Sequence, residues 1–194
     1  MENKETALDK PGAGLPFFER MMAKYFVMPR EVKKRSWDEC GALFDREGSR
    51  ILELIKNLTP EQLEKKVLID RLPGIEDSSR FWSVKMTLEH LIVVGNGIGK
   101  IVGSLTQEIP PTVDVDIAKV KPKGTKPTAE TVTVFKSFEE NQIARVNATV
   151  KNHESKLRHP HPWFGPMTAK QWFWLMASHQ VIHRRQIREI IKGL

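Results

Sequence analysis

The sequence predicts an all-α protein: a four-helix bundle with a long crossover between the second and third helices, preceded by a short leading helix. Apolar residues recur at helical spacing along four long segments, and β-branched alternation is scarce. A proline-rich connection of roughly 20 residues separates the two middle segments. Because such a connection can return along the whole bundle, we expect the two middle helices to run in the same direction.

The first half of the chain contains a leading helix and the first bundle helix. Residues 15–28 form the leading helix, and Ser36 with Glu39 makes a capping box for the next one. A Thr-Pro pair at 59–60 begins a short helical turn, and residues 66–80 are expected to form a loop. The expected core positions of the first bundle helix are Phe44, Ile51, Ile55 and Leu58.

Three further helices are expected in the second half. They span about 83–105, about 128–153 and from the capping box at 168–171 almost to the C-terminus. The crossover occupies 106–128, and a proline-rich corner occupies 158–166. The core candidates are Val84, Leu88, Leu91, Val94, Ile98 and Ile101 on the second bundle helix, and Val134, Phe135, Phe138, Ile143, Val146 and Val150 on the third.

Composition places the chain among ordinary globular proteins. Its 194 residues, 40% hydrophobic and 28% charged, are enough for one core. We divide it into an N-terminal extension, 1–33, and a bundle domain, 34–194. The polar start MENKETALDKPGAG lacks the apolar region of a secretory signal, and no apolar stretch is long enough to span a bilayer. The single cysteine, Cys40, excludes an internal disulfide. We therefore expect a cytoplasmic protein without a membrane partner.

Two histidines four residues apart mark the last helix as a candidate site. Its inward stripe comprises Trp172, Met176, His179, His183, Gln186 and Ile190, at spacings of four and three. Imidazoles at i and i+4 can bind one metal ion, although such a pair alone is more often structural. His90, beside the apolar stripe of the second bundle helix, adds a third imidazole, and burying all three without partners would be costly. A divalent metal ion (Zn, Ni, Fe or Mn) held by His90, His179 and His183 accounts for all three and leaves coordination positions open.

Three motifs carry a resemblance to a known family. TLEHL around His90, HPWFGPMT at 161–168 and HQVIHRRQI from His179 are similar to the signature regions of the DinB/YfiT-like superfamily. The resemblance implies a four-helix bundle with a divalent metal on His90, His179 and His183. Relatives include thiol-dependent S-transferases, a mycothiol-dependent isomerase and proteins described as metal-dependent hydrolases. Because these relatives catalyse different reactions, the resemblance indicates the metal site more specifically than the substrate.

The leading functional hypothesis is a metal-dependent S-transferase or hydrolase acting on a small-molecule substrate, with a low-molecular-weight thiol as one candidate. A bound cation would lower the pKa of a thiol or water in the open position. Gln186 is the candidate catalytic residue, which would orient a ligand or support a metal-binding histidine from behind. The alternative is a buried amide that hydrogen-bonds a neighbouring helix. Gln180 occupies the position of the glutamate in His-Glu-x-x-His peptidases, so a zincin protease is not expected. The alternative is a non-catalytic bundle that binds a ligand or partner.

The net charge of +7 lies in the last part of the chain. Residues 145–194 hold nine Lys or Arg and two acidic residues, and the rest of the chain is balanced. A basic end can bind nucleic acid or an anionic small molecule, or it can be a solvated helix face. No reading helix or aromatic-basic interleaving is present, so nucleic acid is not expected. An apolar face on the leading helix indicates packing on its own bundle or across a homodimer; its residues are Phe17, Phe18, Met21, Met22 and Phe26.

Several remaining signals have two interpretations. Gly95, Gly99 and Gly103 present one smooth face, for close helix approach or for a substrate pocket. Glu89 is expected to be a solvated surface residue. The histidines of the corner, 159 and 161, belong to a rigid turn or to a second metal motif, and the aromatic pair at 163–164 is expected to roof the site.

Overall fold

The computed structural model describes residues 8–194. Residues 1–7 include the start of the polar segment from which no secretory signal is expected, and they lie outside the described residues. No helix in the described part of the chain is long and apolar enough to cross a membrane.

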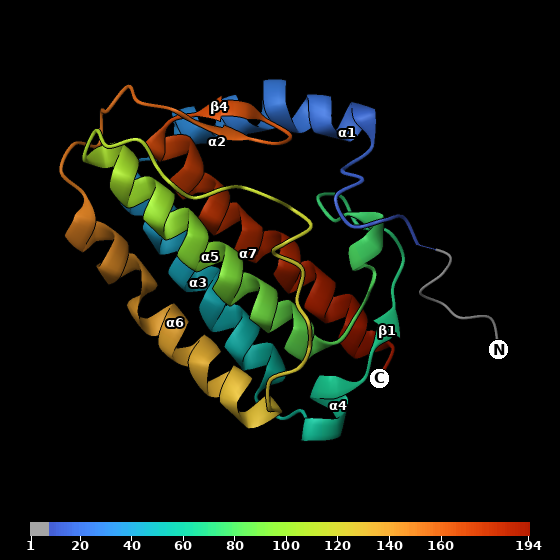
Figure 1. Cartoon of the computed structure of the whole chain (residues 1–194). Coiled ribbons are helices and arrows are strands. Elements are labelled where there is room, and N and C mark those ends of the chain that lie inside the picture. Colours follow the sequence, from blue (N-terminus) through green and yellow to red (C-terminus); the bar gives the residue numbers. More distant parts are fainter. Residues whose placement is uncertain (1–7) are drawn as a thin grey trace.

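Four long helices form the bundle: α3 (Trp37–Ile55), α5 (Val84–Thr106), α6 (Thr128–Thr149) and α7 (Ala169–Lys192). Figure 1 shows α5 and α6 running in one direction and α3 and α7 in the other, with the crossover returning along the bundle. The predicted fold class, long crossover included, is confirmed.

The expected helix starts are present as hydrogen-bonded caps. Capping boxes at Ser36 and Thr168 begin α3 and α7, and the Ser83 hydroxyl accepts the Met86 N–H at the start of α5. The third bundle helix is shorter than predicted: it ends at Thr149 rather than near His153, because the chain turns toward the end of α5. There the backbone N–H of Asn152 donates to the Thr106 carbonyl at 3.0 Å.

The core is continuous through the bundle and includes most of the expected positions. Four of these positions are fully buried: Phe44 and Ile51 on α3, Leu88 on α5 and Phe135 on α6. Val134 contradicts the prediction, since it is 37% exposed. It neighbours Phe135 on α6, and the narrow buried face of that helix admits the phenylalanine and turns the valine toward solvent.

The predicted glycine face packs α5 against α6. A Cβ on Gly95 would lie 2.4 Å from Cζ of Phe138, and one on Gly99 would lie 2.7 Å from Nε2 of Gln142. Close helix approach is therefore the reason for these glycines. Gly97, by contrast, has open space within 4 Å of its missing Cβ.

Short elements replace two segments expected to be irregular. In the predicted loop, β1 (Val67–Leu68) pairs antiparallel with β2 (Phe81–Trp82); in the predicted corner, β3 (His159–His161) pairs with β4 (Gly165–Met167). Strands of two or three residues have too little alternation to be recognised in a sequence. A short helix, α4 (Pro60–Glu64), follows α3 with its own capping box at Thr59, as expected. A single 3-10 turn spans Asp77–Ser79.

The leading helix is longer than predicted and crosses one end of the bundle (Figure 1). It comprises α1 (Phe17–Met22), one π-helical turn (Ala23–Val27) and α2 (Met28–Lys34), with helical backbone angles at each junction. We call residues 15–35 the leading segment. Its predicted apolar face is largely exposed in the monomer, with Phe18 at 81%.

Candidate metal centre

The three histidines singled out in the sequence converge in the structure. His90 comes from α5, and His179 and His183 come from α7. Nε2 of His179 lies 3.2 Å from Nε2 of His90 and 3.0 Å from Nε2 of His183. One potential ligand atom from each residue lies within 4.8 Å of the others. The inward stripe predicted for α7 therefore faces the predicted histidine on α5.

Hydrogen bonds behind two of the rings determine which nitrogen is free to bind a cation. Nδ1 of His90 lies 2.8 Å from the carbonyl oxygen of Val120 in the crossover. Because a carbonyl only accepts, that Nδ1 carries the proton, and the lone pair of His90 is on Nε2.

Gln186 has the same effect on His183. Its Oε1 lies 2.7 Å from Nδ1 of His183, while its Nε2 donates to the carbonyl of Ser79 at 2.7 Å. The bond to Ser79 fixes the orientation of the amide, so Oε1 must accept from the imidazole. Two neutral rings are thus held with their Nε2 lone pairs toward His179. Gln186 contacts a candidate ligand from behind, which is the supporting role considered for it in the sequence.

The site favours neutral imidazoles. Burial lowers the pKa of His90 to about 4. Burial, together with the neighbouring histidines, also holds the pKa of His179 and of His183 well below the ordinary value. Neutral imidazole is the form that binds a metal ion, so the ligands need no deprotonation near pH 7.

The spacing fits a divalent cation. Two imidazole nitrogens at 2.0–2.1 Å from a tetrahedral Zn²⁺ are separated by about 3.3 Å, and by about 3 Å when they are adjacent in an octahedral site. The observed separations of 3.0 and 3.2 Å agree with both geometries. Three neutral nitrogen donors do not select among Zn, Ni, Fe and Mn.

Residues that the sequence did not indicate surround the trio. The indole of Trp82 packs against the ring of His90, with centroids 5.1 Å apart, and stacks with His183 at 6.2 Å. Nζ of Lys121 lies over the same indole, 5.4 Å from its centroid, and forms an ion pair with Glu76. No spacing rule connects these residues, since they come from short strands, a turn and the crossover.

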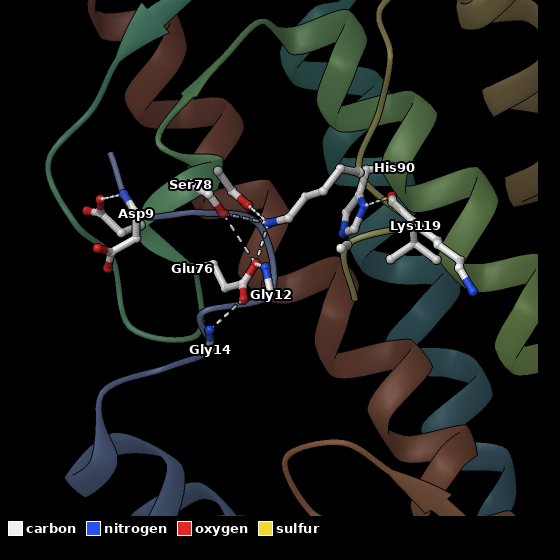
Figure 2. A network of polar contacts seen from close by, with 12 residues as sticks. Asp9, Gly12, Gly14, Glu76, Ser78, His90 and Lys119 are labelled. Carbon is white, nitrogen blue, oxygen red and sulfur yellow. Dashed lines mark hydrogen bonds and ion pairs between the residues drawn. The ribbon is translucent and has the colours of Figure 1, made fainter. Parts of the chain in front are cut away.

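Glu76 also ties the start of the described chain to the site. Its carboxylate accepts the backbone N–H groups of Gly12 and Gly14, the latter at 2.7 Å, as Figure 2 shows beside His90. Burial opposes the charge on Glu76, but the hydrogen bond and charge of Lys121 outweigh burial and lower the pKa of Glu76. The carboxylate is therefore an ionised anchor rather than a proton donor.

A cavity of about 820 Å³ opens onto the trio. Trp163 and Phe164 line it from the β3–β4 turn, in agreement with the expected roof. The leading segment supplies the rest of the roof; its lining residues are Leu15, Glu19, Met22, Ala23, Val27, Met28, Glu31 and Arg35. A cavity of this size accommodates a drug-sized molecule.

The two corner histidines face different surroundings. Nε2 of His159 lies 3.0 Å from the carbonyl of Val113, outside the trio. His161 is buried and lines the cavity; burial lowers its pKa to about 4. Its Nδ1 accepts the backbone N–H of Trp163 at 3.1 Å, which places the ring proton on Nε2. The ligand cluster found among the described residues includes neither histidine, so the rigid-turn interpretation agrees with the structure.

A second polar cluster lines the same cavity. Glu47 of α3 is 2% exposed and accepts hydrogen bonds from three guanidinium groups, those of Arg46, Arg50 and Arg184. Burial favours the neutral acid, but the arginines, Arg184 foremost, outweigh it and lower the pKa of Glu47. We call these four residues the arginine cluster. The basic C-terminal region thus contributes Arg184 to a contact between α7 and α3.

Two further single residues, Glu89 and Cys40, are buried in the structure. Glu89 is 8% exposed, which contradicts the expected solvated position. The crossover covers it, and its Oε2 accepts the backbone N–H of Gly124 at 2.9 Å. Cys40 is fully buried, and burial raises the pKa of its thiol, which is typical of a packing residue rather than a reactive one.

The chain was compared with proteins of known structure and sequence. TT2238, described as a four-helix bundle protein, superposes with a TM-score of 0.54 at 18% identity, over 79% of this chain and 98% of the other. An uncharacterised protein from Escherichia coli UTI89 gives a TM-score of 0.44 at 16% identity, over 81% and 93%. No curated protein sequence has significant similarity to the chain. The family model of the DinB family matches residues 28–194, starting inside the predicted extension, and by this match the chain belongs to the DinB family.

Proposed function

We propose that this protein is a metal-dependent enzyme in which His90, His179 and His183 hold one divalent cation, and that it transfers a small thiol to an electrophilic substrate or hydrolyses that substrate. The observation that carries the proposal is the pair of fixed tautomers. Val120 and Gln186 hold the Nδ1 protons of two ligands, so two Nε2 lone pairs converge beside the third ring. Hydrogen bonds within the protein therefore set the orientation of the His90 and His183 imidazoles.

A bound divalent cation lowers the pKa of a thiol or water in its open position and so supplies a nucleophile near neutral pH. The chain's own residues position the reactants. Gln186 keeps His183 oriented, and Trp82 excludes water from behind the trio by packing on two of its rings. His161 lies on the cavity wall, and we assign its Nε2–H as a hydrogen-bond donor to the bound substrate.

The size of the cavity favours the transferase over the hydrolase. Hydrolysis requires room for one organic reactant, and thiol transfer requires room for two. A volume of about 820 Å³ is near the upper end of the range for single drug-sized ligands. A small-molecule substrate and a cytoplasmic location belong to the same proposal.

Metal content tests the proposal first. The protein is purified without a nickel column or chelator, reconstituted with each candidate metal and analysed. The wild type should bind about one equivalent, and His179→Ala and His183→Ala should lose it. His153→Ala is the matched control, because this exposed histidine stacks on Trp37 and should leave the stoichiometry unchanged. A wild type that binds no metal, or alanine variants that bind it fully, would refute the site.

Activity tests the reaction. The metal-loaded protein is assayed with bacillithiol, mycothiol and glutathione, each paired with 1-chloro-2,4-dinitrobenzene, and separately with an ester. Turnover that needs both a thiol and the metal supports transfer, whereas metal-dependent ester cleavage without a thiol supports hydrolysis. A fully loaded protein that is inactive in all of these assays would favour the non-catalytic binding bundle.

A further inference from the structure

The roof of the cavity presents apolar surface that is not covered by the described chain. Met22 is 52% exposed and Val27 is 46% exposed, although both line the cavity. Across the cavity, α7 contributes Leu175 and Ile182 to the lining. Apolar groups on two facing walls gain free energy when a third apolar group displaces water between them, at about 25 cal/mol per Å². This lining therefore suits a ligand with an apolar body.

Both ends of this roof are anchored, so the walls are preformed. Near its start, Glu19 forms an ion pair with Arg71 and accepts the backbone N–H of Gly74. Toward its end, Met28 is 3% exposed and packs in the core, and the helix leads directly into α3. A roof fixed at two points over an open interior loses little conformational entropy when a ligand enters.

The arginine cluster gives the same cavity a positive end. Arg46 Nε, Arg50 Nη1 and Arg184 Nε donate to the single carboxylate of Glu47, at 3.2, 2.7 and 2.6 Å. With Glu47 ionised, three positive charges meet one negative charge, and two remain uncompensated within the cluster. A guanidinium has five N–H donors, and each of these bonds uses one of them. Donors therefore remain for an anion, and Arg46 and Arg50 are about half exposed, at 53% and 54% of the side chain.

We propose that the cavity binds an amphipathic carboxylate, with its apolar body between the leading segment and α7 and its carboxylate on Arg46 and Arg50. This ligand would be one reactant of the proposed metal-dependent reaction, and to that extent the inference rests on the proposed function. Charge complementarity at one end and uncovered apolar walls along the middle select this chemistry. A neutral hydrocarbon would leave the guanidinium donors unused, and a cation would be repelled by them.

Three ten-carbon probes that differ only in the head group test the charge preference. Decanoate, decanol and decyltrimethylammonium are titrated into the metal-loaded wild type by calorimetry. Charge-assisted hydrogen bonds to the guanidinium groups are stronger than neutral ones, so decanoate should bind at least about tenfold more tightly than decanol. The ammonium compound should bind more weakly than decanol. Equal binding of decanoate and the ammonium compound would overturn the proposal.

Two variants with opposite expected effects test the assignment of the head group. Arg50→Met should reduce decanoate affinity several-fold and leave decanol unchanged. Glu47→Gln keeps all three arginines and removes the negative charge, so it should strengthen decanoate binding, and it remains informative if the arginine variant folds poorly. Lys136→Met, on the exposed face of α6 at 66% side-chain exposure, is the control and should change nothing. Unchanged decanoate binding in both cluster variants would refute the arginine site.

The roof and the metal are tested separately. Met22→Asp should weaken decanol and decanoate alike, and unchanged affinity for both would refute the apolar wall. If decanoate loses its advantage over decanol when the metal is removed, the carboxylate binds the metal and the arginine assignment is wrong. Full metal stoichiometry without decanoate binding would refute this inference alone. Decanoate binding by a protein that never takes up metal would refute the proposed function and leave the arginine site standing.

Discussion

Raising the pH should destabilise this protein through one buried carboxyl group, Glu139, and replacement by glutamine should remove the effect. Glu139 lies on α6 and is 7% exposed. Burial raises its pKa to about 8, although Nε2 of Gln180 donates to its Oε1 at 2.6 Å, and the charge of Asp45 raises the pKa further. In the described part of the chain, Oε2 of Glu139 and Oε1 of Gln180 are both buried without a hydrogen-bond partner. A neutral carboxylic acid suits this environment, and a carboxylate does not.

The sign and size of the effect follow from proton linkage. The folded state holds the Glu139 proton up to a pKa of about 8, whereas the unfolded state releases it near 4.5. Between these values the folded state binds more protons, so the free energy of unfolding falls as the pH rises, by about 1.4 kcal/mol per unit. The loss is complete above about pH 8 and amounts to about 5 kcal/mol. The buried histidines act in the opposite sense, because their folded pKa is lowered: their contribution is present above about 6.5 and is lost as the pH falls below it.

Urea denaturation of metal-free wild type and Glu139→Gln at pH 5.5, 7.0 and 8.5 measures this effect, and the histidine contribution cancels in the difference. Glutamine can accept from Gln180 and also donate to it, and it does not ionise. The free energy of unfolding of Glu139→Gln, relative to that of the wild type, should therefore increase by about 3 kcal/mol between pH 5.5 and 8.5. Glu140→Gln, one residue along and 58% exposed in its side chain, is the control and should show no pH-dependent gap. A constant gap, or a wild type that gains stability from pH 7.0 to 8.5, would refute the reasoning.

Three further predictions concern the metal site and the glycine face. Gln186→Leu should lower zinc affinity about 10- to 100-fold in a chelator competition, because the ring it orients loses its acceptor; unchanged affinity would show that the amide is only packing. Gly95→Ala should lower the free energy of unfolding by about 1–3 kcal/mol through collision with Phe138, whereas Gly97→Ala should raise it by about 0.5–1 kcal/mol; equal effects would contradict the packing argument. Zinc affinity should stay nearly flat from pH 7.5 to 5.5, because the pKa of His90 is about 4; a steep loss below pH 6.5 would indicate ordinary histidines.

Local spacing was sufficient to predict the bundle and the candidate ligands. The capping boxes at Ser36 and Thr168 depend on residues three apart, and the inward stripe of α7 depends on residues three and four apart. Such patterns are set by helix geometry alone. The convergence of His90 with the pair on α7 followed once each was placed on the face that the bundle buries.

Contacts made by irregular chain could not be predicted in this way. Glu89 was expected in solvent because helix periodicity says nothing about where a crossover lies, and the crossover covers it. Lys121 and Glu76 meet across 45 residues of sequence, and neither belongs to a periodic segment. The carbonyl of Ser79 is a backbone group that every residue type would supply, so no residue type marks it.

The bond between His90 and the carbonyl of Val120 has a consequence for mutagenesis. Alanine at position 120 would keep the carbonyl, so a side-chain scan of the crossover passes over a contact that orients a ligand. The bond requires only that the backbone at position 120 lies beside His90, and the length of the crossover determines where that backbone lies. Inserting or deleting a residue between 107 and 120 should therefore disturb the orientation of His90 although no ligand side chain is changed.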